Sequence, residues 1–119
     1  MTTYSFSFDA PDVLLNMNDR THWRKRAVQV KKWRLFAYLA CPYRPGQPSV
    51  PPCFVQITLP VRDNRRRDPM NYVPTVKAIV DGLVDAGVWP DDDSTWVTVM
   101  EPKLEKRADR RVTVELVPR

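Results

Sequence analysis

Histidine is almost absent from this sequence, and cysteine is rare. The 119 residues include one histidine, His22, and two cysteines, Cys41 and Cys53. Zinc sites and histidine-based catalytic triads usually recruit several such side chains, and the two cysteines lack the C-x-x-C spacing of a zinc ligand pair. The composition therefore argues against both kinds of site, and we expect the two cysteines to remain thiols.

Long apolar runs are also missing. No stretch approaches the twenty or so apolar residues that a membrane-spanning helix needs. Residues 1–9 do not have the charged start and following apolar stretch of a secretory signal. We therefore expect a cytoplasmic protein, with residues 1–119 forming one domain.

The charge balance is basic. Nineteen lysines and arginines stand against fourteen acidic residues, which gives a net charge of +5 and a pI near 9.5. This balance favours an acidic polymer such as DNA as a partner.

Hydrophobic periodicity predicts the main elements. Apolar and polar residues alternate over residues 4–9, 53–61, 96–100 and 112–116, which predicts four strands. Helical spacing predicts helices over residues 22–40, where Trp23, Ala27, Val30, Trp33 and Ala37 share a stripe, and over residues 74–86. Gly87 supplies a stop for the second helix. The order predicts an α+β fold, in which both helices pack on a small mixed or antiparallel sheet of about four strands.

Three segments are expected to be irregular. Residues 11–21 are rich in side chains that favour turns. Residues 42–52 contain five prolines and predict a stiff connector. Residues 103–111 are highly charged and predict a hairpin or loop.

Clustered charge is the strongest functional signal. Arg65, Arg66, Arg67 and Asp68 are followed by Lys77 within the second helix and then by Asp91, Asp92 and Asp93. Each cluster taken alone is also compatible with an ordinary exposed turn. Together they suit a phosphodiester, because arginines hold anionic oxygens, carboxylates bind a divalent metal and a lysine stabilises the charge that develops during cleavage.

The acids provide candidate ligands for Mg²⁺, which prefers oxygen and often takes only one or two carboxylates. Asp68 and Asp92 are the leading candidates, with Asp91 close behind and Asn71 able to add a carbonyl oxygen. Asp81 and Asp85 lie four and eight residues after Lys77, and we expect both to be its ion-pair partners on the helix surface.

The first predicted helix carries basic residues largely off its apolar stripe. They are Arg24, Lys25, Lys31, Lys32 and Arg34, and they form either a solvated face or a face turned towards a phosphate backbone. The helix alone favours neither.

Three blocks of this chain, NMNDRTHWRKR, RRRDPMN and KAIVDGLVDAGVWPDD, resemble the RusA family of Holliday junction resolvases. The resemblance implies a small α+β homodimer, often encoded by phage or prophage, that binds four-way DNA junctions and cuts them symmetrically with Mg²⁺ or Mn²⁺ in recombination and repair. It implies that Asp68, Asn71 and Asp92 belong to the metal site and that Lys77 is the family's lysine.

Two features depart from the family pattern. Met70 stands where the family has a second aspartate, and a thioether is a soft ligand that Mg²⁺ disfavours. Three extra residues also separate Asn71 from Lys77. Two alternatives therefore stay open beside a junction resolvase. One is a junction- or DNA-binding protein that cuts poorly, and the other is a basic protein-interaction domain. The sequence also leaves open whether Asp68 and Asp92 meet within one chain or across a dimer.

Overall fold

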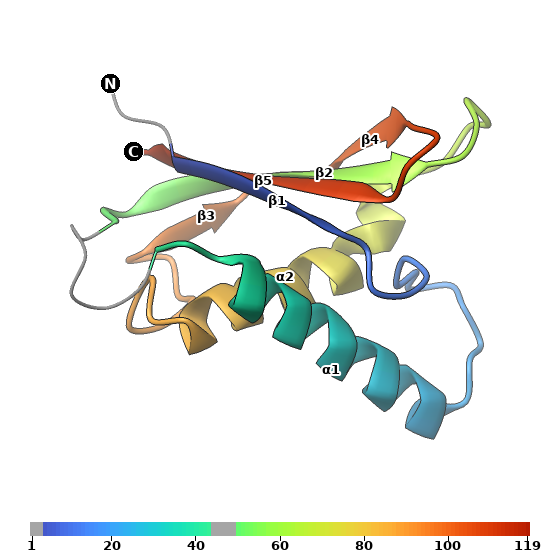
Figure 1. Cartoon of the computed structure of the whole chain (residues 1–119), viewed down its shortest axis with the longest axis horizontal. Helices are drawn as coiled ribbons and strands as arrows, with labels where there is room; N and C mark the ends of the chain where they lie inside the picture. Colours follow the sequence, from blue (N-terminus) through green and yellow to red (C-terminus); the bar gives the residue numbers. More distant parts are fainter. Residues whose placement is uncertain (1–3, 44–49) are drawn as a thin grey trace.

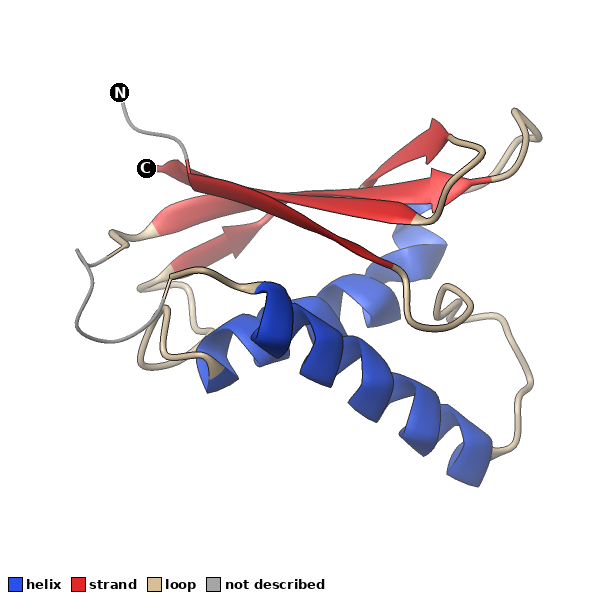
Figure 2. Ribbon diagram, viewed as in Figure 1, coloured by secondary structure: helices blue, strands red, loops and turns tan. Residues whose placement is uncertain are grey.

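The computed structural model describes residues 4–43 and 50–119 and shows a mixed sheet with both long helices on one face (Figures 1 and 2). Within these residues the elements are, in chain order, β1 (Tyr4–Asp9), α1 (Trp23–Ala40), β2 (Cys53–Val61), the 3-10 helix η1 (Pro69–Tyr72), α2 (Val73–Asp85), β3 (Val97–Val99), β4 (Lys103–Lys106) and β5 (Arg111–Pro118). The predicted α+β class is confirmed.

The sheet is mixed because β2 has antiparallel and parallel neighbours. Strand β5 lies between β1 and β2 and is antiparallel to both, with Tyr4 opposite Leu116 and Cys53 opposite Pro118. Strands β3 and β4 pair with the other edge of β2 and run parallel to it. Helix α2 thus connects the parallel strands β2 and β3, as parallel pairing requires a crossover.

The sheet has five strands in the described residues, where four were predicted. The expectation of a hairpin or loop over residues 103–111 was wrong for its first part, because Lys103–Lys106 forms β4. Strands β3 and β4 extend along the same edge of β2, and Met100 continues the pairing by donating its backbone N–H to the carbonyl of Val55 at 2.9 Å. The highly charged sequence of β4 suits its place at the sheet edge, where three of its four residues are exposed.

The core lies between the sheet and the helices. On β2, Val55, Ile57 and Leu59 are buried while the residues between them are at most half-buried, and Val112, Val114 and Leu116 repeat this pattern on β5. The apolar face of α2 packs on these residues, together with Trp33 from α1, through the residues Val76, Ile79, Val80 and Leu83. The alternation that predicted the strands is therefore the alternation that buries one face of the sheet.

The first turns of α1 lie outside the core, and burial begins at Gln29, with Val30 packed against the core. Trp33 and Ala37 are buried as the predicted stripe requires, but Trp23 is 69% exposed and Ala27 is also exposed. The first turns of α1 project beyond the sheet, so the stripe of apolar residues there has nothing to pack against (Figure 1).

Two glycines shape α2. Gly82 faces α1 so closely that a Cβ atom at this position would lie 3.0 Å from the Cβ of Ala37 and closer still to the carbonyl oxygen of Arg34. Gly87 has a φ of 86°, a conformation that L side chains rarely adopt, and its N–H bonds the carbonyl of Val84 at 2.9 Å. The predicted stop at Gly87 is confirmed.

The loop between β1 and α1 is irregular, as predicted, but it is anchored to both helices. The Oγ1 atom of buried Thr75 accepts a hydrogen bond from the backbone N–H of Leu15 at 2.7 Å and donates one to the carbonyl of Leu15 at 3.0 Å. The indole of Trp33 donates to the carbonyl of Val13 at 2.9 Å. These contacts hold the loop beside the start of α2.

Cys41 and Cys53 are both buried, and neither is in a disulfide. Most of the proline-rich connector predicted over residues 42–52 lies outside the described residues. No helix in the described part of the chain combines the length and the apolar character needed to cross a membrane.

Candidate functional site

The chain after β2 turns over residues 62–67, which contain Arg62, Arg65, Arg66 and Arg67 and are called the arginine turn. This turn is built around Asp63. Its carboxylate accepts a hydrogen bond from the backbone N–H of Arg65 at 3.0 Å and forms an ion pair with the guanidinium of Arg67 at 2.9 Å. Both contacts lower the pKa of Asp63, and the backbone hydrogen bond is the larger cause. Arg67 also donates to the carbonyls of Asp63 and Arg65, each at 3.1 Å. Of the three arginines in this turn that were predicted to bind DNA, Arg67 thus braces the turn, while Arg65 and Arg66 are exposed.

Asp68 lies at the start of η1, and its carboxylate accepts a hydrogen bond from the backbone N–H of Met70 at 3.0 Å. Asn71 follows in the same turn and donates its backbone N–H to the carbonyl of Asp68 at 3.1 Å. Met70 is 47% exposed. The short helix therefore presents Asp68, Met70 and Asn71 from a single turn, immediately before α2.

Lys77 joins two carboxylates from different parts of the chain. Its ammonium donates to Asp81, one helical turn away, at 3.0 Å, and also to Asp92 in the loop after α2. The contact with Asp92 is the larger cause of a raised pKa of Lys77, and the same contact lowers the pKa of Asp92. Asp91 accepts the backbone N–H of Asp92 at 2.7 Å. Lys77 and Asp92, both predicted to take part in cleavage, are thus in contact within one chain.

Only one of the two carboxylates predicted to pair with Lys77 does so. The pairing with Asp81 is confirmed, but the prediction for Asp85 was wrong, because Asp85 accepts a hydrogen bond from the guanidinium of Arg34 on α1 at 2.8 Å. Sequence spacing allowed Asp85 to share the face of Lys77, whereas the packing of α1 against α2 supplied a nearer cation. The Arg34 contact is also the main cause of the lowered pKa of Asp85.

The oxygen donors have the chemistry that Mg²⁺ or Mn²⁺ requires, although they are dispersed. Among the described residues, no group of three or more Asp, Glu, His or Cys side chains is placed to hold a metal ion. Two carboxylates, Asp81 and Asp92, converge on the positive charge of Lys77. Mg²⁺ is commonly held by one or two carboxylates together with substrate phosphate. Asp68 contacts only its own turn and Asp92 contacts Lys77, so no hydrogen bond or ion pair of the described residues brings the two leading candidate ligands together.

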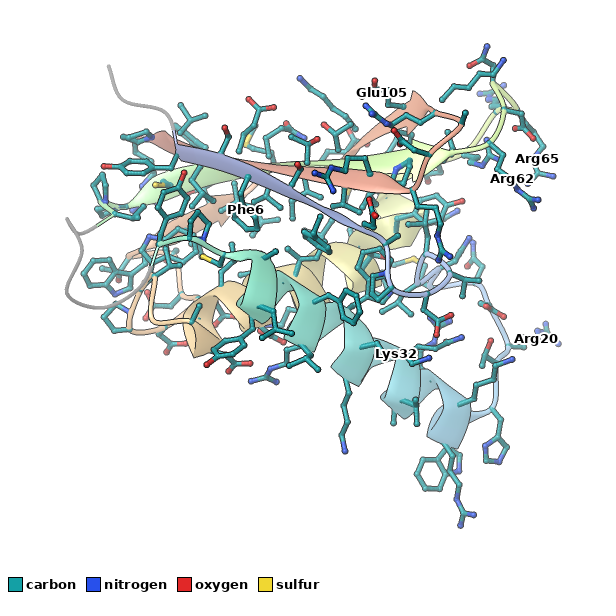
Figure 3. All side chains as sticks on the ribbon, viewed as in Figure 1. Phe6, Arg20, Lys32, Arg62, Arg65 and Glu105 are labelled. Carbon is teal, nitrogen blue, oxygen red and sulfur yellow. The ribbon has the colours of Figure 1, made fainter. Side chains whose placement is uncertain are left out.

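Lys32 of α1 and Arg20 of the loop before it lie towards the same end of the molecule as Arg62 and Arg65 of the arginine turn (Figure 3). Lys32 forms an ion pair with Asp12 at 3.2 Å. The guanidinium of Arg24 stacks over the exposed indole of Trp23, 5.2 Å from its ring centre. Lys25 and Lys31 are exposed. This end of the molecule therefore carries positive charge on both the helical side and the sheet side.

A cavity of about 580 Å³ lies beside the arginine turn. Its walls come from the loop after β1, the end of β2, η1 and the turn between β4 and β5. Arg65 and Arg67 line it, but so do Arg62, Arg107 and Arg110, which were absent from the predicted site residues. The sequence carried little signal for the last two, because they reach the cavity only after β4 and β5 have paired on opposite sides of β2.

The chain matches no model of a known protein family, and it also matches no curated protein.

Proposed function

We propose that this protein is a metal-dependent endodeoxyribonuclease that cuts four-way DNA junctions in recombination and repair. The contact between Lys77 and Asp92 carries the proposal. Fifteen residues separate them in the sequence, yet the loop after α2 returns to place an acid against the lysine that the proposed chemistry requires. The resemblance of the surrounding motifs to RusA resolvases supports the choice of substrate.

In this proposal Asp68 and Asp92 hold Mg²⁺ or Mn²⁺, assisted by Asp91 and Asn71. The ion, when bound, would supply a water of lowered pKa and polarise the phosphodiester. Lys77 stabilises the negative charge that develops on the phosphate oxygens. The exposed cations of the arginine turn and of α1 hold the DNA backbone without reading its sequence.

The proposed active form is a homodimer, because a junction with paired arms suits two identical sites related by symmetry. The outer surface of α1 supports self-association, since it leaves large apolar side chains in water. Val28, Leu35 and Leu39 are 54%, 50% and 62% exposed, respectively. Apolar side chains grouped on one exposed helix face are typical of an interaction surface.

Met70 and the dispersed acids favour a second candidate, a junction-binding protein that cuts poorly. Met70 occupies the position of a family aspartate, and no cluster of three potential ligand side chains occurs in the described residues. A site with fewer hard ligands would bind Mg²⁺ more weakly and would still leave the cationic surface able to hold DNA.

A cleavage assay separates the two candidates. Purified protein is incubated with a labelled four-way junction, a linear duplex of the same sequence or single strands, in Mg²⁺, Mn²⁺ or chelator. The nuclease proposal expects paired, symmetric nicks in the junction, dependent on metal and abolished by Asp68→Asn. Tight junction binding without nicks would instead support the second candidate, and weak equal binding to all three DNAs would favour a basic protein-interaction domain.

The variant Met70→Asp adds the acid that the family has at this position. We expect cleavage to rise by about tenfold or more, because a hard carboxylate replaces a soft thioether near the metal. An unchanged rate would show that the site of this chain uses other ligands.

A further inference from the structure

The cavity beside the arginine turn carries more positive charge than its own acids neutralise. Two carboxylates line it, Asp12 and Asp109. Asp12 is already paired with Lys32 at 3.2 Å, and Asp109 is paired with Arg107 at 2.6 Å. Neither acid is therefore left to balance the other arginines of the cavity.

Of those arginines, Arg67 is balanced by Asp63. Arg62, Arg65 and Arg110 also line the cavity, and none of these three forms an ion pair with any described residue. Like charges that share one cavity repel each other. An anion bound between them would relieve this repulsion, and phosphate suits it because guanidinium groups donate paired hydrogen bonds to phosphate oxygens.

The other residues that line the cavity indicate a ligand that has an apolar part beside its anionic group. Leu14, Pro60 and Tyr72 contribute apolar surface beside the arginines. Such surface lowers the local dielectric constant, which strengthens the attraction between arginine and phosphate. The cavity volume of about 580 Å³ lies within the range of ordinary small-molecule sites, so it has space for a sugar beside the phosphate.

We propose that this cavity holds one phosphodiester group of a DNA strand with its adjoining sugar, bound by Arg62, Arg65 and Arg110. The proposal rests on the proposed function in taking DNA as the ligand, and it assigns a strand-holding site that is separate from the candidate metal ligands. Asp68, Lys77 and Asp92 do not line this cavity. Because Asp68 directly follows the arginine turn in the chain, a strand held here is led towards η1.

The test measures binding of a labelled four-way junction by fluorescence anisotropy in chelator, which separates binding from cleavage. Arg62→Ala, Arg65→Ala and Arg110→Ala are compared with Arg111→Ala, a matched control that removes the same charge. Arg111 neighbours Arg110 in the chain but pairs with Asp9 at 3.2 Å and does not line the cavity. We expect each cavity variant to weaken binding about tenfold and to reduce the salt slope by about 0.9. The control should change binding less than twofold.

Equal losses in Arg110→Ala and Arg111→Ala would overturn the cavity site, because the effect would then be one of overall charge. The site would also be overturned if inorganic phosphate or a free nucleotide bound in an arginine-dependent way while junction affinity stayed unchanged in the variants. Failure of the cavity site and failure of the nuclease proposal give different results. Arginine-dependent binding without metal-dependent nicks would support the cavity site and reject the nuclease. Metal-dependent nicks with binding unchanged in the cavity variants would support the nuclease and reject the cavity site.

Discussion

Lys77 is the residue on which the proposed chemistry most depends, and its position is held by two carboxylates. Its side chain remains 60% exposed although it contacts both Asp81 and Asp92. These ion pairs are accessible to water and therefore contribute little to stability. These ion pairs instead orient the Lys77 side chain, because they keep its ammonium beside the loop that carries Asp91 and Asp92.

The variant Lys77→Met tests this role. Methionine keeps an unbranched side chain but removes the charge, so we expect junction cleavage to fall by about 10²- to 10³-fold while binding weakens much less. Cleavage rates and anisotropy titrations measure the two effects. Lys106→Met, which removes an exposed lysine from β4, serves as the control and should cleave normally. Equal losses of binding and cleavage would show that Lys77 only attracts DNA.

The pH dependence of stability should reveal the Lys77 and Asp92 pair. Because Lys77 lowers the pKa of Asp92, the contribution of this carboxylate is present above its unfolded pKa of about 3.9 and is lost as the pH falls through the lower folded pKa. The pKa of Lys77 is raised, so its contribution to stability changes with pH in the opposite direction. The contribution of Lys77 to the free energy of unfolding is present below its unfolded pKa of about 10.4 and is lost as the pH rises through the folded pKa.

Urea unfolding of the wild type and of Asp92→Asn measures this effect. We expect a difference in unfolding free energy of less than about 1 kcal/mol near neutral pH, since the pair is exposed, and a smaller difference below about pH 3. A difference that grows on acidification would contradict the assignment of Lys77 as the partner of Asp92.

At the scale of elements, the candidate site depends on a loop that has no regular structure of its own. The loop after β1 forms one wall of the arginine cavity, and it is held by the hydroxyl of Thr75 from α2 and by the indole of Trp33 from α1. Thr75 is fully buried, so both of its hydrogen bonds to Leu15 are made away from water.

The variant Thr75→Val preserves the shape of the side chain and removes both hydrogen bonds. Leaving the N–H of Leu15 unsatisfied in the interior should lower the unfolding free energy by about 1–3 kcal/mol, measured by urea denaturation. Thr113→Val, on the half-buried outer face of β5, is the matched control and should change stability by less than about 0.5 kcal/mol. Similar decreases of the unfolding free energy in the two variants would show that the hydrogen bonds between Thr75 and Leu15 do not contribute specifically to stability.

At the scale of the whole molecule, the net charge of +5 is distributed unevenly enough to form a cationic end. Three cavity arginines without ion-pair partners in the described residues, together with the exposed cations of α1, predict binding that depends strongly on salt. The three arginines alone should give a slope of log affinity against log salt of about −2.7, and the complete surface a steeper one. Anisotropy titrations from 50 to 300 mM salt provide the measurement, and a flat dependence would contradict an electrostatic DNA interface.

Self-association of the protein should depend less on salt than DNA binding does. If the exposed apolar residues of α1 contribute to the homodimer, its interface depends on apolar burial, which salt does not screen. Light scattering should therefore give about twice the chain mass of 13.9 kDa at both low and high salt. A mass of one chain at micromolar concentration would reject the homodimer and with it the paired-site account of symmetric cutting.

Much of the secondary structure followed from the sequence, because the patterns that specify it are local. Alternation over residues 53–61 predicted β2 with the observed bounds, and helical spacing with Gly87 predicted α2 to within one residue at each end. The ion pair of Lys77 with Asp81 was predictable for the same reason, since four residues bring side chains together on any helix. The charged strand β4 was missed because its pairing with β2, and not its own pattern, makes it a strand.

The sequence by itself determined the burial pattern of β2, β5 and α2 and the charges available to the site, because these depend on residue type and short-range spacing. Tertiary structure alone decided the partners: Asp85 with Arg34, Asp92 with Lys77, and Arg62 and Arg65 beside Arg110 in one cavity. These contacts join segments that are far apart in the chain, and distance along the chain does not say how close two segments lie in space. The segments came together only when the strands paired around β2 and both helices packed on one face of the sheet.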